Sequence, residues 1–239
     1  MLFLVTALIA FAGSFVQSSS GFGYAIVCMA LWPLLMPFRT ASILEAVTAF
    51  FMVVYITARL FRHIDWKLLL PPACVAGVFS LLGVNTLMAL SETAMHKILG
   101  VALLVLAVYF IFFSARVHLH PTLLTGMAAG MAGGFCGGLF NIGGPPMVAY
   151  FFSVTDDKLK YNATLQAFFC VNTITIFCIH LVKGNLTADM LPLGAAALCG
   201  TALGTISGFL LFRKLTMKGI KKIIYTFMVC AGFYMVLFG

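Results

Sequence analysis

The chain has 239 residues, of which 63% are hydrophobic and 8% are charged, with a formal net charge of +8. Soluble domains usually carry about 25% charged residues, so this composition excludes an ordinary soluble enzyme or binding module. The basic residues lie in short segments between apolar runs, so we attribute the positive charge to the orientation of the chain in a membrane. We therefore expect no nucleic-acid partner. Because these runs do not alternate as barrel strands do, we expect an all-α, polytopic helical membrane protein.

Five apolar segments fill the first half of the chain, at 1–19, 22–37, 40–61, 67–90 and 95–115. Most approach or exceed the length that crosses a bilayer, about 17–25 residues. The first segment lacks the basic start of a secretory signal, so we interpret it as a membrane helix. The sequence "QSSSGFG" at 17–23 predicts a helix break. Whether 22–37 crosses fully or partly stays open.

Five further segments follow, at 121–140, 145–154, 160–182, 188–212 and 218–238. The second of these has only about ten residues, which at 1.5 Å per residue cannot cross an apolar core of about 30 Å. It follows "FNIGGPP" at 140–146, whose prolines suit the first turn of a helix. We therefore expect a half-helix, and with the preceding helix a broken or re-entrant pair.

The two halves show weak similarity that indicates an internal duplication. A shift of 121 places Ser20–Gly23 on Asn141–Gly144 and Glu45 on Gln166, and a shift of 123 aligns 96–110 with 219–233. Similarity at such spacing is typical of repeat architectures. We predict two transmembrane repeats, 1–118 and 119–239.

The distribution of basic residues predicts the orientation of these repeats. If the first two segments return to their starting side, then of the 14 Lys and Arg only Arg39, Lys97 and Lys183 lie opposite the other eleven. The positive-inside rule then places both termini on the non-cytoplasmic side of the cell inner (plasma) membrane. An odd number of crossings per repeat makes the repeats inverted, an arrangement typical of transporters that bind substrate near the midplane.

The two predicted breaks suit a small oxyanion. Half-helix N-termini present N–H groups and a positive dipole end, and glycine lets the backbone approach a ligand closely. We expect contacts from Ser19, Ser20, Gly21, Phe22 and Gly23 in one half, and from Asn141, Ile142, Gly143 and Gly144 in the other. The alternative is helix packing, which we favour for Gly126, Gly130, Gly134 and Gly138 because of their spacing.

A family resemblance agrees with this hypothesis. "GGFCGGLFNIGGPPMVAYF" (133–151) with "KYNATLQAFF" (160–169) resembles the second-repeat signature of the TauE/SafE family of sulfite exporters. "SSSGFGYAIVCMALWPLL" (18–35) resembles its first-repeat counterpart, and the likeness covers nearly the whole chain. The resemblance implies transport, usually outward, of a sulfur-containing anion such as sulfite, sulfoacetate, sulfolactate or thiosulfate.

Other polar residues lie within or beside the apolar segments. Glu45 is a candidate carrier of a coupled proton, because acids in membrane segments are functional hypotheses by default; the alternative is an interfacial carboxylate beside Arg39. Arg39 either guides anions or anchors the interface. Gln166, Thr173 and Asn172 lie where they could reach the second break, and we select Gln166.

The leading hypothesis is a secondary transporter that works by alternating access, since no GxxxxGK[ST] nucleotide motif occurs. The alternatives are an anion-selective channel, or a transporter of another small carboxylate or oxyanion. An intramembrane enzyme with a serine nucleophile would need a base at similar depth, and only His180 is a candidate, so we expect no enzyme. The seven cysteines form no CxxC motif, so we expect no metal and no cofactor.

Overall fold

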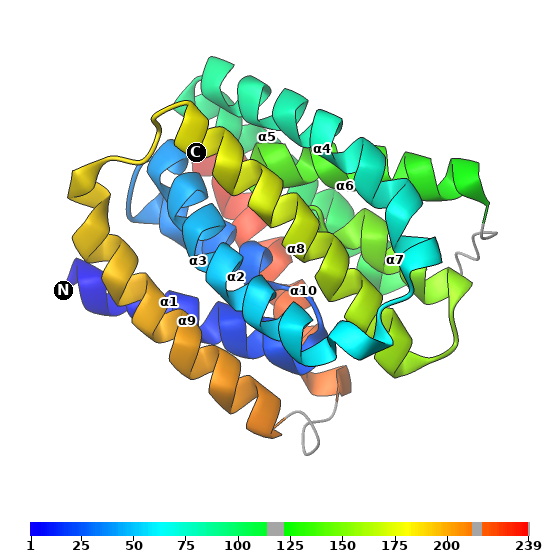
Figure 1. Cartoon of the computed structure of the whole chain (residues 1–239). Helices are drawn as coiled ribbons and strands as arrows, with labels where there is room; N and C mark the ends of the chain where they lie inside the picture. The colour runs from blue at the N-terminus through cyan, green and yellow to red at the C-terminus, as the bar shows by residue number, and fades with distance from the viewer. Residues whose placement is uncertain (114–121, 212–216, 239) are drawn as a thin grey trace. The chain divides into compact units, whose positions relative to one another are not determined.

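The computed structural model describes residues 1–113, 122–211 and 217–238, and within these ranges every regular element is helical (Figure 1). Of the described helices, seven are long and apolar enough to cross a membrane. This confirms the prediction of an all-α, polytopic membrane fold.

The helices begin and end within a few residues of the predicted segments. The seven long apolar helices are α1 (Leu2–Ser20), α3 (Phe38–Leu60), α4 (Trp66–Ala89), α5 (Glu92–Val108), α6 (Leu123–Phe140), α8 (Lys158–Val182) and α9 (Leu191–Leu211). A further helix, α10 (Met217–Phe238), has 22 residues. Short 3-10 turns stand at Trp32–Leu34, Phe61–His63 and Ala188–Met190, and a π-helical turn, Tyr109–Phe113, continues α5.

Two helices are too short to cross a bilayer. The first is α2 (Tyr24–Leu31), with eight residues and a 3-10 turn of three after it. The second is α7 (Gly144–Val154), with 11 residues. At 1.5 Å per residue each reaches about 17 Å, roughly half of an apolar core of about 30 Å. The half-helix predicted at 145–154 is confirmed, and segment 22–37 proves to hold a second one.

The helices group by contact into two compact units. The first unit comprises Met1–Ala49, Ala89–Ala115 and Leu186–Gly239, and the second comprises Phe50–Met88 and Arg116–Asn185. Each unit contains one of the predicted breaks and takes residues from both predicted repeats. The repeat boundaries 1–118 and 119–239, and the inverted orientation of the repeats, stay predictions.

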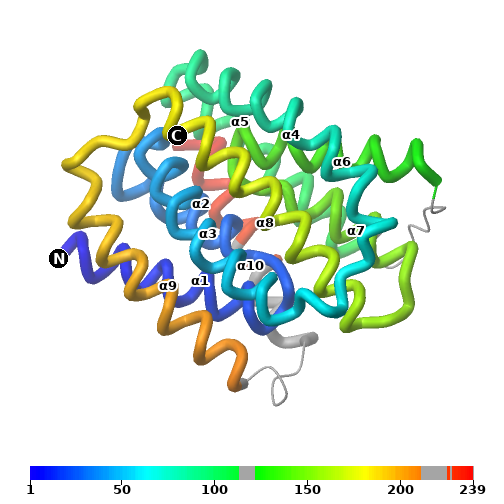
Figure 2. The backbone as a smooth tube through the Cα atoms, viewed as in Figure 1, coloured from blue at the N-terminus to red at the C-terminus, as the bar shows by residue number. Residues whose placement is uncertain are grey.

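In the first unit, α1 and α9 run side by side (Figure 1 and Figure 2). Three glycines one turn apart on α9 each meet backbone of α1: Gly200 at Ala7, Gly204 at Phe11 and Gly208 at Phe15. A Cβ at any of the three would collide with a main-chain oxygen. Close helix approach of this kind replaces the hydrophobic drive that lipid cannot provide.

The second unit repeats this device with the glycines on α6. The contacts with the α4 backbone are Gly130 at Pro72, Gly134 at Ala76 and Gly138 at Ser80. Gly126, at the other end of the same face, meets the side chain of Tyr150 on α7. The prediction that these four glycines serve helix packing is confirmed.

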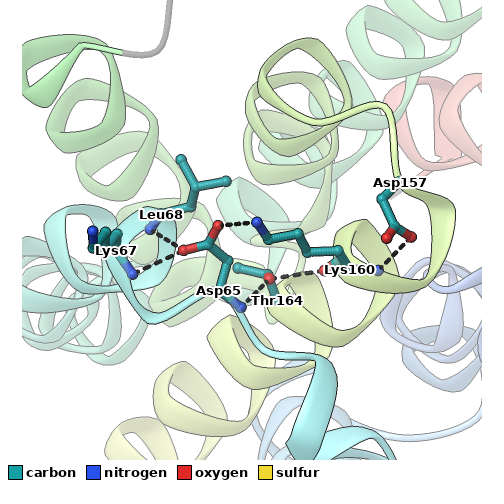
Figure 3. Close-up of polar contacts among 6 residues, drawn as sticks. All are labelled: Asp65, Lys67, Leu68, Asp157, Lys160 and Thr164. Atoms are coloured by element: carbon teal, nitrogen blue, oxygen red, sulfur yellow. Dashed lines mark hydrogen bonds and ion pairs between the residues drawn. The ribbon is translucent and has the colours of Figure 1, made fainter.

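A polar cluster joins the starts of α4 and α8 in the same unit (Figure 3). Asp65 Oδ1 accepts from the backbone amides of Lys67 and Leu68, and its Oδ2 lies 2.7 Å from Lys160 Nζ. Thr164 Oγ1 accepts from the amide of Asp65 at 3.0 Å. Partial burial acts to raise the pKa of Asp65, but the bond from Lys160 and the two amides together hold it below its ordinary value.

Substituting Gly134→Ala is expected to destabilise the second unit, because the added methyl would strike the Ala76 backbone, which cannot move as a side chain can. Overpacking of this kind costs about 1–3 kcal/mol. The matched control is Gly77→Ala on α4, whose added Cβ would lie 4.0 Å from Thr175 Cγ2. Thermal unfolding in detergent compares the two. Equal melting temperatures for both variants would contradict the packing role of Gly134.

Substituting Asp65→Asn is expected to lower the unfolding free energy by about 0.2–1 kcal/mol near pH 7, the range for partly exposed ion pairs. Because the pKa of Asp65 is lower in the folded than in the unfolded state, its charge stabilises the fold above about pH 4. That contribution disappears as the pH falls through the folded value. Denaturant titrations from pH 7 to pH 3 should show the two proteins converging at the acid end; a constant difference would refute the ion pair.

Candidate functional site

The first break lies between α1 and α2. Gly21 ends α1 with φ 89°, and its amide donates to the carbonyl of Gln17 at 2.7 Å. Gly23 precedes α2 with φ 120°. Side chains other than glycine rarely adopt these angles, so the two glycines at this reversal are required by the backbone. Both residues and Phe22 between them are buried.

Two of the three serine hydroxyls at the first break bond to backbone carbonyls. Ser20 Oγ lies 2.7 Å from the carbonyl of Phe22 and 2.8 Å from that of Val16, and Ser19 Oγ donates to the carbonyl of Val16 at 3.1 Å. An anion at this break would therefore contact Ser19 or Ser20 only after such a bond is released. The buried hydroxyl of Ser18 has no hydrogen-bond partner among the described residues.

Gln17 is a residue that the sequence analysis did not select. Its Oε1 accepts from the amide of Tyr24, the first residue of α2, at 3.1 Å. It therefore occupies one donor of the half-helix N-terminus. The pattern "QSSSGFG" contained this residue, but the distance of seven positions hid its contact with Tyr24.

Phe22 is an anchor of the first break. Its ring stacks on Phe110 with centroids 5.4 Å apart, and Phe110 stacks on Tyr225 at 5.6 Å. Phe110 lies in the π-helical turn that continues α5, and such turns frequently stand at functional sites. The aromatic column ties the break to α5 and α10.

The second break lies between α6 and α7. Asn141 ends α6 with φ 61°, a left-handed conformation that asparagine tolerates. Its backbone N–H donates to the carbonyl of Gly137 at 2.7 Å. Gly143 precedes α7, and Ile142 between them is buried. Gly21 thus corresponds to Asn141 and Gly23 to Gly143, an offset of 120. Gly23 and Gly143 differ in conformation, with φ of 120° and −77°, and the alignment of the two halves stays a prediction.

The start of α7 differs chemically from the start of α2. Pro145 and Pro146 occupy its first turn and carry no N–H, so two of the usual donors are missing. Gly143 packs so closely on the Gly133 backbone that a Cβ would collide with it. The second break therefore keeps the positive end of a helix dipole but offers few amides of its own.

The structure places the selected α8 residue, Gln166, in a buried position. Its side-chain Nε2 donates to Asn162 Oδ1 at 3.3 Å, and its backbone carbonyl accepts from Thr57 Oγ1 at 3.1 Å. A contact of Gln166 with substrate stays a prediction. Asn172, which was considered but not selected, is the α8 residue whose amide faces Gly137 and Gly143.

Glu45 is buried within the first unit, with 3% of its surface exposed. It lies near Tyr24 and Cys28, beside a hydroxyl cluster in which Tyr24 Oη is 2.6 Å from Thr48 Oγ1 and 3.0 Å from Thr201 Oγ1. Glu45 lies seven residues after Phe38, the first residue of α3, and the choice between a proton carrier and an interfacial carboxylate stays a prediction.

A second acid, Glu92 at the start of α5, contacts the first residue of α3. Glu92 Oε2 accepts from the amide of Phe38 at 2.7 Å, where a helix dipole favours a carboxylate. Arg39 beside it is exposed, and its Nη2 donates to the carbonyl of Leu90 at 3.0 Å. Arg39 is thus held at the link between α4 and α5, on the surface of the first unit.

Comparison with known proteins agrees with this architecture. The family model described as Sulfite exporter TauE/SafE matches residues 5–235. No curated protein and no solved structure matches the chain. The matched range includes both helix breaks, Glu45 and Gln166, and it leaves out only a few residues at each end of the chain. The chain therefore belongs to the TauE/SafE sulfite exporter family.

Proposed function

We propose that this protein is a secondary transporter that exports a small sulfur-containing anion, such as sulfite or an organosulfonate. Membership of the TauE/SafE family supports transport of this class of anion. The sequence contains no phosphate-binding GxxxxGK[ST] motif, so an ion gradient or the gradient of the anion itself drives the movement.

The observation that supports this function best is the pair of buried helix breaks. Both interrupt helices inside an apolar protein, and both begin a half-helix whose positive dipole end lies within the fold. The residues that form them, 17–23 and 140–146, carry no formal charge, and their polar members are serines, Gln17 and Asn141. Dipoles and amides attract an oxyanion but hold it less tightly than a lysine, which suits a ligand that must also leave.

We propose an anion contact at each break by itself: with the backbone at Gly21–Gly23 in the first unit, and with the backbone at Ile142–Gly144 and the side-chain amide of Asn141 in the second. Because Ser19 and Ser20 are bonded to their own helix, their hydroxyls join the contact only when those bonds exchange. Gln166 supplies a further amide from α8. Alternating access then exposes the bound anion to each side in turn.

Glu45 is proposed to carry a coupled proton. It is a buried acid in a membrane-spanning helix, and its backbone carbonyl lies 3.1 Å from Thr48 Oγ1, which in turn lies 2.6 Å from Tyr24 Oη. An acid within a membrane segment is a functional hypothesis by default, and proton relays are among the roles of such acids. Arg39, exposed at the start of α3, is proposed to guide anions toward the protein.

The Asn141 amide is tested by comparing Asn141→Gly with Asn141→Ala in proteoliposomes loaded with sulfite. Glycine keeps the left-handed backbone and removes only the amide, whereas alanine also strains the turn. We expect saturable sulfite flux in the wild type and a fall of about 10-fold or more for Asn141→Gly, the size of a lost bond to a charged group. Wild-type flux in Asn141→Gly would show that only the backbone conformation of Asn141 matters.

Proton coupling is tested with Glu45→Gln, which keeps the shape of the side chain and removes the exchangeable proton. We expect a pH gradient to drive sulfite flux in the wild type. The variant should lose this response while it still moves sulfite down a sulfite gradient. Glu92→Gln is the control, because Glu92 caps α3 and should leave the pH response unchanged. An unchanged pH response in Glu45→Gln would exclude Glu45 as the coupling residue.

A further inference from the structure

Asn172 on α8 presents a buried amide to the second break. Its side chain is 5% exposed, and its Oδ1 lies 2.6 Å from Ser80 Oγ on α4. The serine hydroxyl also lies 2.7 Å from the carbonyl of Ala76 and 3.2 Å from that of Gly134. A hydroxyl donates one proton, and Asn172 Oδ1 is its nearest acceptor. Ser80 therefore orients the amide plane.

The other end of this amide, Nδ2, is directed at the break. A Cβ at Gly137 would collide with Nδ2, and a Cβ at Gly143 would lie 3.4 Å from it. Two glycines thus leave space for the amide between the last turn of α6 and the start of α7. Among the residues that the structure describes, Nδ2 has no hydrogen-bond acceptor.

Asn172 is a buried residue, and a side-chain donor of such a residue that finds no acceptor in the protein is available to a bound ligand. The start of α7 favours an anion as that ligand. Its dipole attracts an anion, but Pro145 and Pro146 cannot donate hydrogen bonds to it. Asn172 Nδ2 lies beside Gly143, the residue that precedes α7, and offers donors where the prolines offer none.

We propose that Asn172 is a further anion-binding residue: its Nδ2 donates to an oxygen of the transported oxyanion at the start of α7, and Ser80 is the positioning residue that orients it. This assignment rests on the proposed function, because the ligand is the transported anion. It adds to the second break a neutral donor from α8, where Pro145 and Pro146 supply none.

The test is sulfite transport by purified protein in proteoliposomes, with the variants Asn172→Asp, Asn172→Ala and Ser80→Ala. Asn172→Asp keeps the shape and the oxygen that faces Ser80, and it replaces Nδ2 with a negatively charged oxygen. We expect its KM for sulfite to rise more than 10-fold, with a smaller rise for Asn172→Ala and a two- to fivefold rise for Ser80→Ala. Thr175→Val on the same helix is the control, since that hydroxyl donates to its own helix at Val171.

Thermal unfolding in detergent, with and without sulfite, separates binding from folding. Sulfite should raise the melting temperature of the wild type and of Thr175→Val, but not that of Asn172→Asp. If Asn172→Asp does not fold, Asn172→Ala and Ser80→Ala carry the same comparison. The order of KM values, with aspartate above alanine, is the result that a purely structural role of Asn172 would not produce.

The outcomes separate the two proposals. If the wild-type protein neither transports nor is stabilised by sulfite or the organosulfonate sulfoacetate, the proposed function fails, and the assignment of Asn172 fails with it. If the wild type transports sulfite and folded Asn172 variants keep its KM within twofold, only the assignment of Asn172 is overturned.

Discussion

The structure depends on one constraint, which is that backbone polar groups within a bilayer must find partners inside the protein. A helix meets this constraint along its length, and a break does not. At the first break Gln17, Ser19 and Ser20 bond to nearby main-chain groups. At the second, two prolines remove donors that would otherwise need partners. The two breaks meet the same demand by different chemistry, and this difference determines which groups each can offer an anion.

Close helix packing at glycines allows both breaks to lie inside the protein. On α9 and on α6, glycines one turn apart bring α1 and α4, respectively, to backbone contact. Gly133 lets the start of α7 lie against α6, and Gly137 leaves space for the amide of Asn172. The same small residues therefore stabilise the helix pairs and admit polar side chains from other helices. Removing a glycine in this part of the fold would alter both packing and site.

Hydropathy and helix-breaking residues were enough to predict the helices and the half-helix α7, because both signals are local. They did not fix the length of segment 22–37, since its apolar run continues into the 3-10 turn at Trp32–Leu34. Glu45 was left between the interface and the interior because burial depends on neighbours from other helices. Gln17 and Asn172 were missed for the same reason: their contacts are set by side-chain direction across the fold.

The central claim, that this fold carries a sulfur-containing anion by alternating access, is tested most directly by counterflow. Proteoliposomes are loaded with unlabelled sulfite at high concentration and diluted into a trace of labelled sulfite. A carrier that binds sulfite on each side in turn predicts transient accumulation of label above its equilibrium level, which loading with chloride does not produce. Label that enters at the same rate with either load, and never exceeds equilibrium, would contradict the account and indicate a pore or no sulfite pathway.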